Sequence, residues 1–119
     1  MKPVTNIDKF LKRFNNFKDG EFRSIEVSSA TTMLVTLAGQ DEARAFDWIA
    51  LKLEFTNVSD ARLLDNAKLL HVDMSDGISI IKEDNSIIFG IGQYNTFSSV
   101  KNATCFIESE HIKYEEDLF

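Results

Sequence analysis

The first clear pattern of apolar positions lies near the amino terminus. Five apolar residues recur there at spacings of three and four: Ile7, Phe10, Leu11, Phe14 and Phe17. This spacing is typical of one face of an α-helix. Thr5 and Asp8 resemble a capping box with Asp in place of Glu, and Gly20 supplies a stop. We predict an amphipathic helix over residues 7–17 that packs its phenylalanine face on a sheet.

The opposite face of this helix is basic. Lys9, Lys12 and Arg13 fall between the apolar positions, where they face water. Cations toward the carboxy-terminal end of a helix also complement its dipole.

Beyond Gly20 the pattern becomes that of β-strands. The clearest alternation places Ile49, Leu51, Leu53 and Phe55 on one face and the residues between them on the other. It predicts an antiparallel strand with one face on the core and one toward water. Further strands are predicted over residues 21–28, 31–37, 78–82, 86–91 and 103–114, and residues 39–45 and 93–102 are typical of loops.

Residues 60–72 fit two interpretations. Leu63, Ala67 and Leu70 are spaced for a helix face. The same segment also fits two short strands around the Asp65-Asn66 pair, because both residues tolerate positive φ. We favour strands, since every neighbouring element is a strand.

These elements predict an α+β fold in a single domain over residues 1–119. One N-terminal amphipathic helix packs on a curled, mostly antiparallel sheet of about six strands. Curling is expected because one helix cannot cover a wide, flat sheet.

The composition narrows the range of binding partners that we expect. Thirteen basic and nineteen acidic residues give a net charge of −6, without the basic stripe that a nucleic-acid partner requires. The same sign argues against anionic membranes, and no apolar stretch approaches the roughly 20 residues of a membrane span. A single cysteine and an amino terminus without an apolar leader indicate the cytoplasm.

The acidic residues concentrate in the second half. Residues 61–119 hold ten acidic and five basic residues, including Glu108 and Glu110. Such a surface suits a basic protein partner, and it is also typical of a solvated chain end.

The segment from His71 to Gly77 offers the main candidate chemistry. His71 with Asp73 and Asp76 could ligate a metal or act as an acid/base pair. The EF-hand pattern fails there, because its sixth position, counted from Asp73, is Ile78 instead of glycine. We favour a turn leading into the Ile78 strand, since Asp-Gly is a common turn pair.

Two other candidates have ordinary structural interpretations. Cys105 with His71 or His111 could form an activated thiolate, but Cys105 lies in a predicted strand and is expected to be a buried apolar residue. Trp48 has the parity of a polar strand face and would suit a binding surface, as would Tyr94 and Tyr114. For Trp48 we favour the core, because tryptophan is buried on average. No cofactor or metal motif is present, and we expect no enzyme activity.

Two stretches together resemble a known group of proteins. Residues 17–26 form a polar turn that feeds a strand, and residues 49–58 form a strand closing in Phe55-Thr56-Asn57-Val58. This pairing resembles small bacterial proteins, some of them placed among the immunity proteins of polymorphic toxin systems. The resemblance implies a β-rich cytoplasmic protein without catalysis that binds a toxin or another protein.

Three functional hypotheses follow. The first is a non-catalytic protein-binding module, immunity-like, that uses an acidic surface on a basic partner. The second is a small-molecule binder or small enzyme with a site near His71, Asp73 and Asp76. The third is a homo-oligomer, for example a homodimer, that pairs exposed strand edges such as the long terminal strand.

Overall fold

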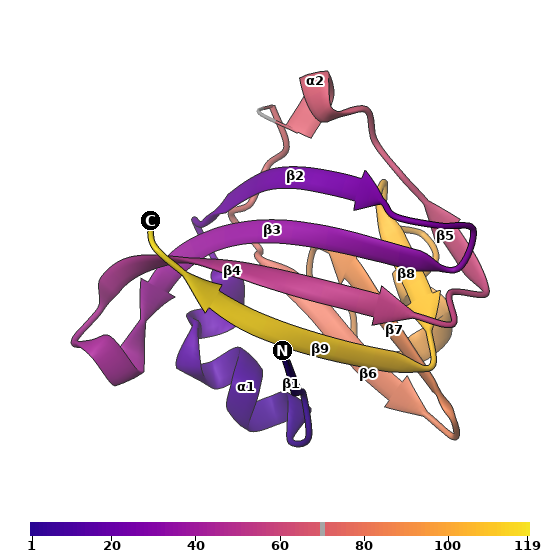
Figure 1. Ribbon diagram of the computed structural model, residues 1–119, viewed down its shortest axis with the longest axis horizontal. Coiled ribbons are helices and arrows are strands. Elements are labelled where there is room, and N and C mark those ends of the chain that lie inside the picture. Colours follow the sequence, from indigo (N-terminus) through magenta and orange to yellow (C-terminus); the bar gives the residue numbers. More distant parts are fainter. Residues whose placement is uncertain (70) are drawn as a thin grey trace.

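A computed structural model describes residues 1–69 and 71–119 as an α+β fold with two antiparallel sheets (Figure 1). The larger sheet contains, in spatial order, β1 (Lys2–Pro3), β9 (His111–Asp117), β4 (Asp47–Thr56), β3 (Thr32–Asp41) and β2 (Glu21–Val27). The smaller sheet contains β5 (Asp60–Arg62), β8 (Phe106–Ser109), β7 (Ser86–Ile91) and β6 (Ile78–Glu83). The α+β class and the antiparallel pairing are confirmed, but the expected single sheet of about six strands is wrong.

The core lies between the two sheets. The alternation predicted for β4 is confirmed, because its four apolar residues are buried and pair with buried residues of β3. Phe55 of the larger sheet meets Phe89 of the smaller one, with ring centroids 5.3 Å apart. The apolar face of the larger sheet is therefore covered by a second sheet, and not by the curling of a single sheet.

The chain changes sheets at two corners. After β4 it passes through Asn57, whose φ is 54°, and enters β5 of the other sheet. The predicted strand over residues 103–114 is also divided, because β8 ends at Ser109 and β9 begins at His111 in the opposite sheet. Period-two alternation continues through such a bend, so the hydrophobic pattern alone does not show the break.

The N-terminal helix packs on the core as predicted, but it is shorter. Helix α1 (Ile7–Arg13) is capped by Asn6 and not by Thr5, because the Asn6 side chain accepts a hydrogen bond from the Lys9 amide. A 3-10 turn, η1 (Asn15–Phe17), follows. The left-handed residues there are Asn15 to Phe17 and Asp19 instead of Gly20. Phe14 and Phe17 are nevertheless buried, with ring centroids 4.9 Å apart.

The outer face of the smaller sheet carries its own apolar cluster. The segment expected to be a loop over 93–102 contains helix α3 (Phe97–Val100), whose Val100 is buried against Ile88 and Phe106. Gly90 permits this packing, since a Cβ at that position would lie 2.5 Å from a Val100 methyl carbon. Gly90 therefore marks close packing, and Gly92 follows the end of β7.

Two segments differ in part from the prediction. Residues 60–62 form strand β5, as favoured, but the second expected strand is wrong, because Asn66–Leu69 form helix α2. Leu70 lies outside the described residues. Residues 39–41 continue β3 instead of forming a loop, and η2 (Glu42–Arg44) makes the turn toward β4.

No helix within residues 1–69 and 71–119 is long and apolar enough to cross a membrane.

Candidate binding site beside helix α1

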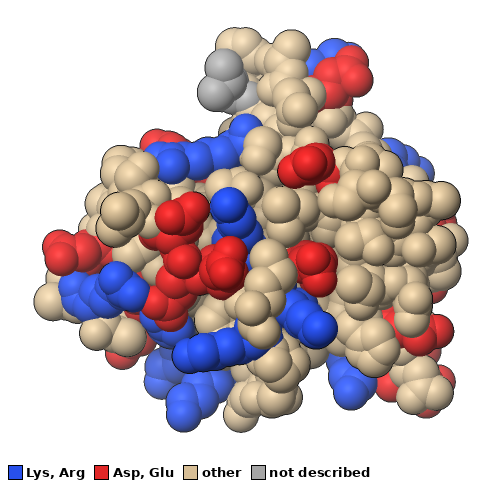
Figure 2. All heavy atoms as spheres, viewed as in Figure 1, with Lys and Arg blue, Asp and Glu red and all other residues tan. Residues whose placement is uncertain are grey.

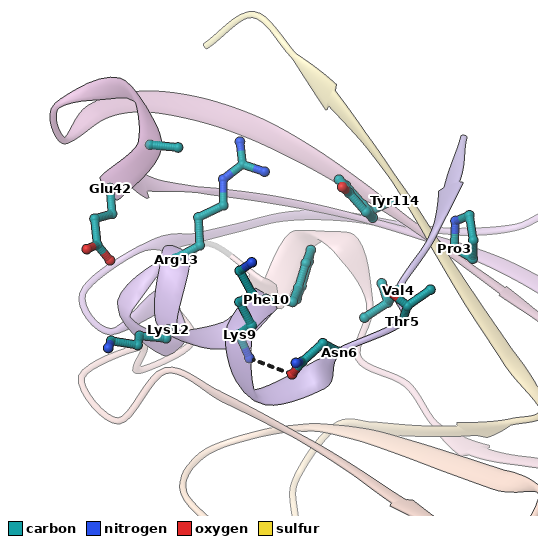
Figure 3. A pocket seen from close by; sticks show the side chains of 11 residues that line it. Pro3, Val4, Thr5, Asn6, Lys9, Phe10, Lys12, Arg13, Glu42 and Tyr114 are labelled. Carbon is teal, nitrogen blue, oxygen red and sulfur yellow. Dashed lines mark hydrogen bonds between the residues drawn. The ribbon is translucent and has the colours of Figure 1, made fainter.

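A cavity of about 580 Å³ opens between helix α1, strands β1 and β9, and the turn η2 (Figure 3). Its apolar surface comes from Pro3, Val4, Phe10 and Tyr114. Its polar lining comes from both ends of α1 and from η2: Thr5, Asn6, Lys9, Lys12, Arg13 and Glu42. Apolar lining with a few fixed polar groups is the usual make-up of a ligand site.

The spacing of α1 builds this lining. Phe10 turns into the molecule, where its ring lies 5.2 Å from that of Tyr114 and 5.4 Å from that of Phe14. Lys9, Lys12 and Arg13 flank Phe10 at positions that share one side of the helix. A basic edge therefore runs along an apolar surface.

One wall of the cavity is held by an ionic cluster. Arg13 Nε and Nη2 donate to the two Asp41 carboxylate oxygens at 2.8 and 2.7 Å, and Nη2 also donates to Glu116 Oε1 at 2.7 Å. Arg44 bonds Glu116 and lies 3.4 Å from Asp41. The cluster thereby joins α1, the end of β3, η2 and β9.

The cluster keeps its members ionised. The Asp41 side chain is 0% exposed, and its hydrogen bonds from Arg13 hold its pKa below the ordinary value despite burial. Arg13 likewise lowers the pKa of Glu116, and Asp41 raises the pKa of Arg13. Bidentate arginine–carboxylate pairs are rigid, so this wall is fixed in geometry and in charge.

The free positive charge of the cavity belongs to two lysines. Lys9 and Lys12 are exposed and form no ion pair with any of the described residues, whereas Arg13 is shared between two carboxylates. Only Glu42 of the lining carries an opposing free charge. The cavity therefore presents a net positive rim above an apolar floor.

The sequence-predicted site at His71, Asp73 and Asp76 is an exposed turn. All three side chains are exposed, and Asp73 Oδ1 accepts a hydrogen bond from the Ser75 amide at 2.9 Å, which lowers the Asp73 pKa. Gly77 completes the turn with a φ of 69°. Within the described part of the chain no three His, Cys, Asp or Glu side chains are grouped to hold a metal. The interpretation as a turn is confirmed.

The acidic candidates lie at one corner between the sheets. Glu108 accepts a hydrogen bond from Ser59 Oγ at 3.0 Å and pairs with Lys101 at 3.1 Å. Glu110 accepts one from Asn57 Nδ2 at 3.2 Å. Each carboxylate therefore has a structural partner, and neither lines the cavity.

Trp48 and Cys105 are the two remaining candidate residues, and their predictions have different outcomes. The core position favoured for Trp48 is wrong, because it remains 38% exposed on the outer face of the larger sheet, 5.5 Å from the Phe119 ring. Its parity with the polar positions of β4 was the correct indicator. Cys105 is fully buried as expected, and burial raises the pKa of its thiol to about 11. A thiol in that state is a poor nucleophile.

Sequence reasoning missed the cavity as a unit. The chain pattern places Lys9, Lys12 and Arg13 on the water-facing side of the helix, opposite Phe10, and it marks Tyr114 as a candidate binding aromatic. The residues that fix the wall, Asp41 and Glu116, lie 28 and 103 positions from Arg13, and no local pattern connects them.

No protein-family model, no curated protein and no solved structure matches this chain.

Proposed function

We propose that the protein is a non-catalytic protein-binding module, and that the cavity beside α1 receives an acidic and apolar segment of its partner. The observation that carries this proposal is the pairing of free Lys9 and Lys12 with the apolar floor of Phe10 and Tyr114. A carboxylate would meet the lysines while an adjacent apolar side chain covers the rings.

The size of the cavity supports a side-chain anchor. Its 580 Å³ lies within the roughly 300–1,000 Å³ that is typical of ligand sites. A space of this size accommodates one aromatic or large aliphatic side chain together with a neighbouring carboxylate. Large aromatic anchors seated in pockets also dominate the energetics of protein interfaces.

The ionic cluster supports binding by making the wall rigid. Arg13, Asp41 and Glu116 are held at 2.7–2.8 Å before any partner arrives. A preformed wall loses little conformational entropy on binding, so more of the contact energy appears as affinity.

An acidic surface for a basic partner receives less support. The carboxylates near the end of the chain are largely paired within the molecule, since Glu116 binds two arginines and Asp117 lies 3.7 Å from Lys52. On the face drawn in Figure 2, acidic and basic side chains alternate over the larger sheet. Charges interspersed in this way create no single acidic field.

The net charge of −6 sets a condition on the proposed partner. At physiological salt, exposed charges act over about 8 Å. The lysine rim therefore governs contact inside the cavity, while the whole molecule does not attract an acidic partner from a distance. We propose that the module acts in a reducing compartment such as the cytoplasm, where its single thiol, Cys105, stays reduced.

Calorimetric titration with two short peptides tests this proposal. We expect the acidic peptide acetyl-Glu-Phe-Glu-amide to bind and its basic counterpart acetyl-Lys-Phe-Lys-amide not to bind. A chain with Lys9→Glu and Lys12→Glu should bind the acidic peptide at least about tenfold more weakly. Lys68→Glu, which makes the same kind of charge change on the exposed side of α2, is the control. Equal binding of both peptides, or an equal loss in the control, would contradict the proposal.

A further inference from the structure

An exposed aromatic side chain lies beside the cavity. Phe46 follows η2 at the β3–β4 connection, is 61% exposed and has a φ of 66°. A bulky side chain with that φ is a backbone outlier, and holding it in this conformation costs free energy. Within one copy of the chain, Phe46 recovers little of that cost through burial.

The turn that carries Phe46 is firmly built. The Phe46 amide donates to the Asp41 carbonyl at 2.9 Å, and the Asp41 side chain accepts from the Ala43 amide at 3.0 Å. Arg44 ties the same turn to Glu116. An exposed aromatic on a rigid turn is pre-organised as an anchor, since little entropy is lost when it binds.

The chemistry of the anchor matches that of the cavity. Phe46 is followed by Asp47, which is exposed and forms no ion pair with any described residue. The turn therefore offers an aromatic ring and a carboxylate on two consecutive residues. The cavity presents an apolar floor beside Lys9 and Lys12.

The anchor and the cavity are also neighbours. Glu42 and Ala43 of the same turn line the cavity wall, as Figure 3 shows for Glu42. A twofold interface joins one patch to its own copy, so it requires a projection and a complementary hollow side by side on the same surface. The turn that carries Phe46 borders the cavity through Glu42 and Ala43, so a projecting residue and a hollow adjoin each other.

We propose that the occupant of the cavity is a second copy of this chain, with Phe46 and Asp47 of each copy seated in the cavity of the other. This inference rests on the proposed function and names the partner. Phe46 would cover Phe10 and Tyr114, and Asp47 would face the two lysines.

The expected dimer is weak. An aromatic side chain buries about 150–250 Å², so two exchanged anchors cover well under the roughly 1,200 Å² of a stable interface. Association should therefore appear only at high protein concentration.

Sedimentation equilibrium over a wide concentration range tests the dimer. We expect the wild-type chain to move toward the mass of two copies as concentration rises. Phe46→Ala should weaken association at least about tenfold without loss of folding, because the side chain is exposed. A wild-type mass of one copy at every concentration, or a dimer unchanged by Phe46→Ala, would overturn the proposal.

Charge reversal tests the reciprocal geometry. Asp47→Lys alone and Lys9→Glu with Lys12→Glu should each weaken self-association, because like charges then meet at both contacts. An equal mixture of these two chains should regain a heterodimer, because both contacts again join opposite charges. No gain on mixing would overturn the reciprocal arrangement. If self-association fails while the acidic peptide still binds the cavity, the proposed function stands and only this inference falls.

Discussion

Two aspartates with lowered pKa values, Asp41 and Asp73, occupy opposite kinds of setting. Asp41 is buried and bonded to Arg13, which comes from a different element. Asp73 is exposed, and its main partner is the amide of Ser75, two residues away. The first carboxylate holds three segments of the chain together, whereas the second shapes only its own turn.

This difference shows what a pKa shift means for a candidate site. The environment of Asp73 follows from the local turn pattern and requires no function. Asp41, in contrast, belongs to the wall of a cavity. Its burial costs desolvation free energy, which the interactions with two arginines must offset.

Asp41→Asn should give the largest loss of stability. The amide still accepts the Ala43 hydrogen bond, but it leaves Arg13 without its bidentate partner. Breaking a buried ion pair costs about 3–5 kcal/mol, and because Arg13 is 25% exposed we expect about 3 kcal/mol. Urea unfolding measures the change. Arg44→Ala, at the exposed side of the cluster, should cost no more than about 1 kcal/mol; an equal cost in both variants would contradict this account.

Gly77→Ala, in the turn that contains Asp73, should have the next largest effect on stability. Its φ is 69°, and a Cβ there would lie 2.0 Å from the Asn16 carbonyl oxygen. The left-handed conformation and the close contact together should cost about 2 kcal/mol or more in the free energy of unfolding. The measurement is the thermal unfolding of Gly77→Ala, compared with that of Ser75→Ala in the same turn. A Gly77→Ala chain as stable as wild type would show that the turn is not packed against η1.

The stability should fall in acid because of the ionic cluster. Asp41 and Glu116 have native pKa values below 3.8 and 4.5. The unfolded chain therefore binds more protons than the native one as the pH drops. The stabilisation is complete above these ordinary values and is lost as the pH falls through the lower native ones. Urea midpoints measured from about pH 6 to pH 3 should fall less steeply in Asp41→Asn than in wild type. If the urea midpoints of the two chains fell in parallel with pH, the loss of stability in acid would not come from Asp41.

His71→Ala and Asp76→Ala should give the smallest effect. Both side chains are exposed and lie outside the cavity. We expect unchanged unfolding midpoints and an unchanged affinity for the acidic peptide. A loss of peptide binding in either variant would move the functional site back to this turn.

Local patterns predicted much of the fold. The alternation in β4, the strands β6 and β7, and the apolar face of α1 all follow from side-chain periodicity. The division into two sheets does not, because alternation shows which face is buried but not which strand lies alongside. The early end of α1 was also hidden, since it depends on Asn15 and Asn16 adopting left-handed conformations.

The candidate site was less predictable for a related reason. The basic residues of α1 are visible in the chain pattern, which places them on the water-facing side of the helix. The wall that makes these residues part of a cavity depends on β3 and β9 being brought to α1 by the sheet order. The favoured core position of Trp48 also failed because average burial was weighted above strand parity.

The most direct test is to locate where the acidic peptide binds. Acetyl-Glu-Phe-Glu-amide would be titrated into the ¹⁵N-labelled Phe46→Ala chain, so that no second copy competes for the cavity. We expect amide shifts at Lys9 to Arg13, at Ala43 and at Tyr114. Shifts confined to Asp73–Gly77, or none at saturating peptide, would contradict this expectation.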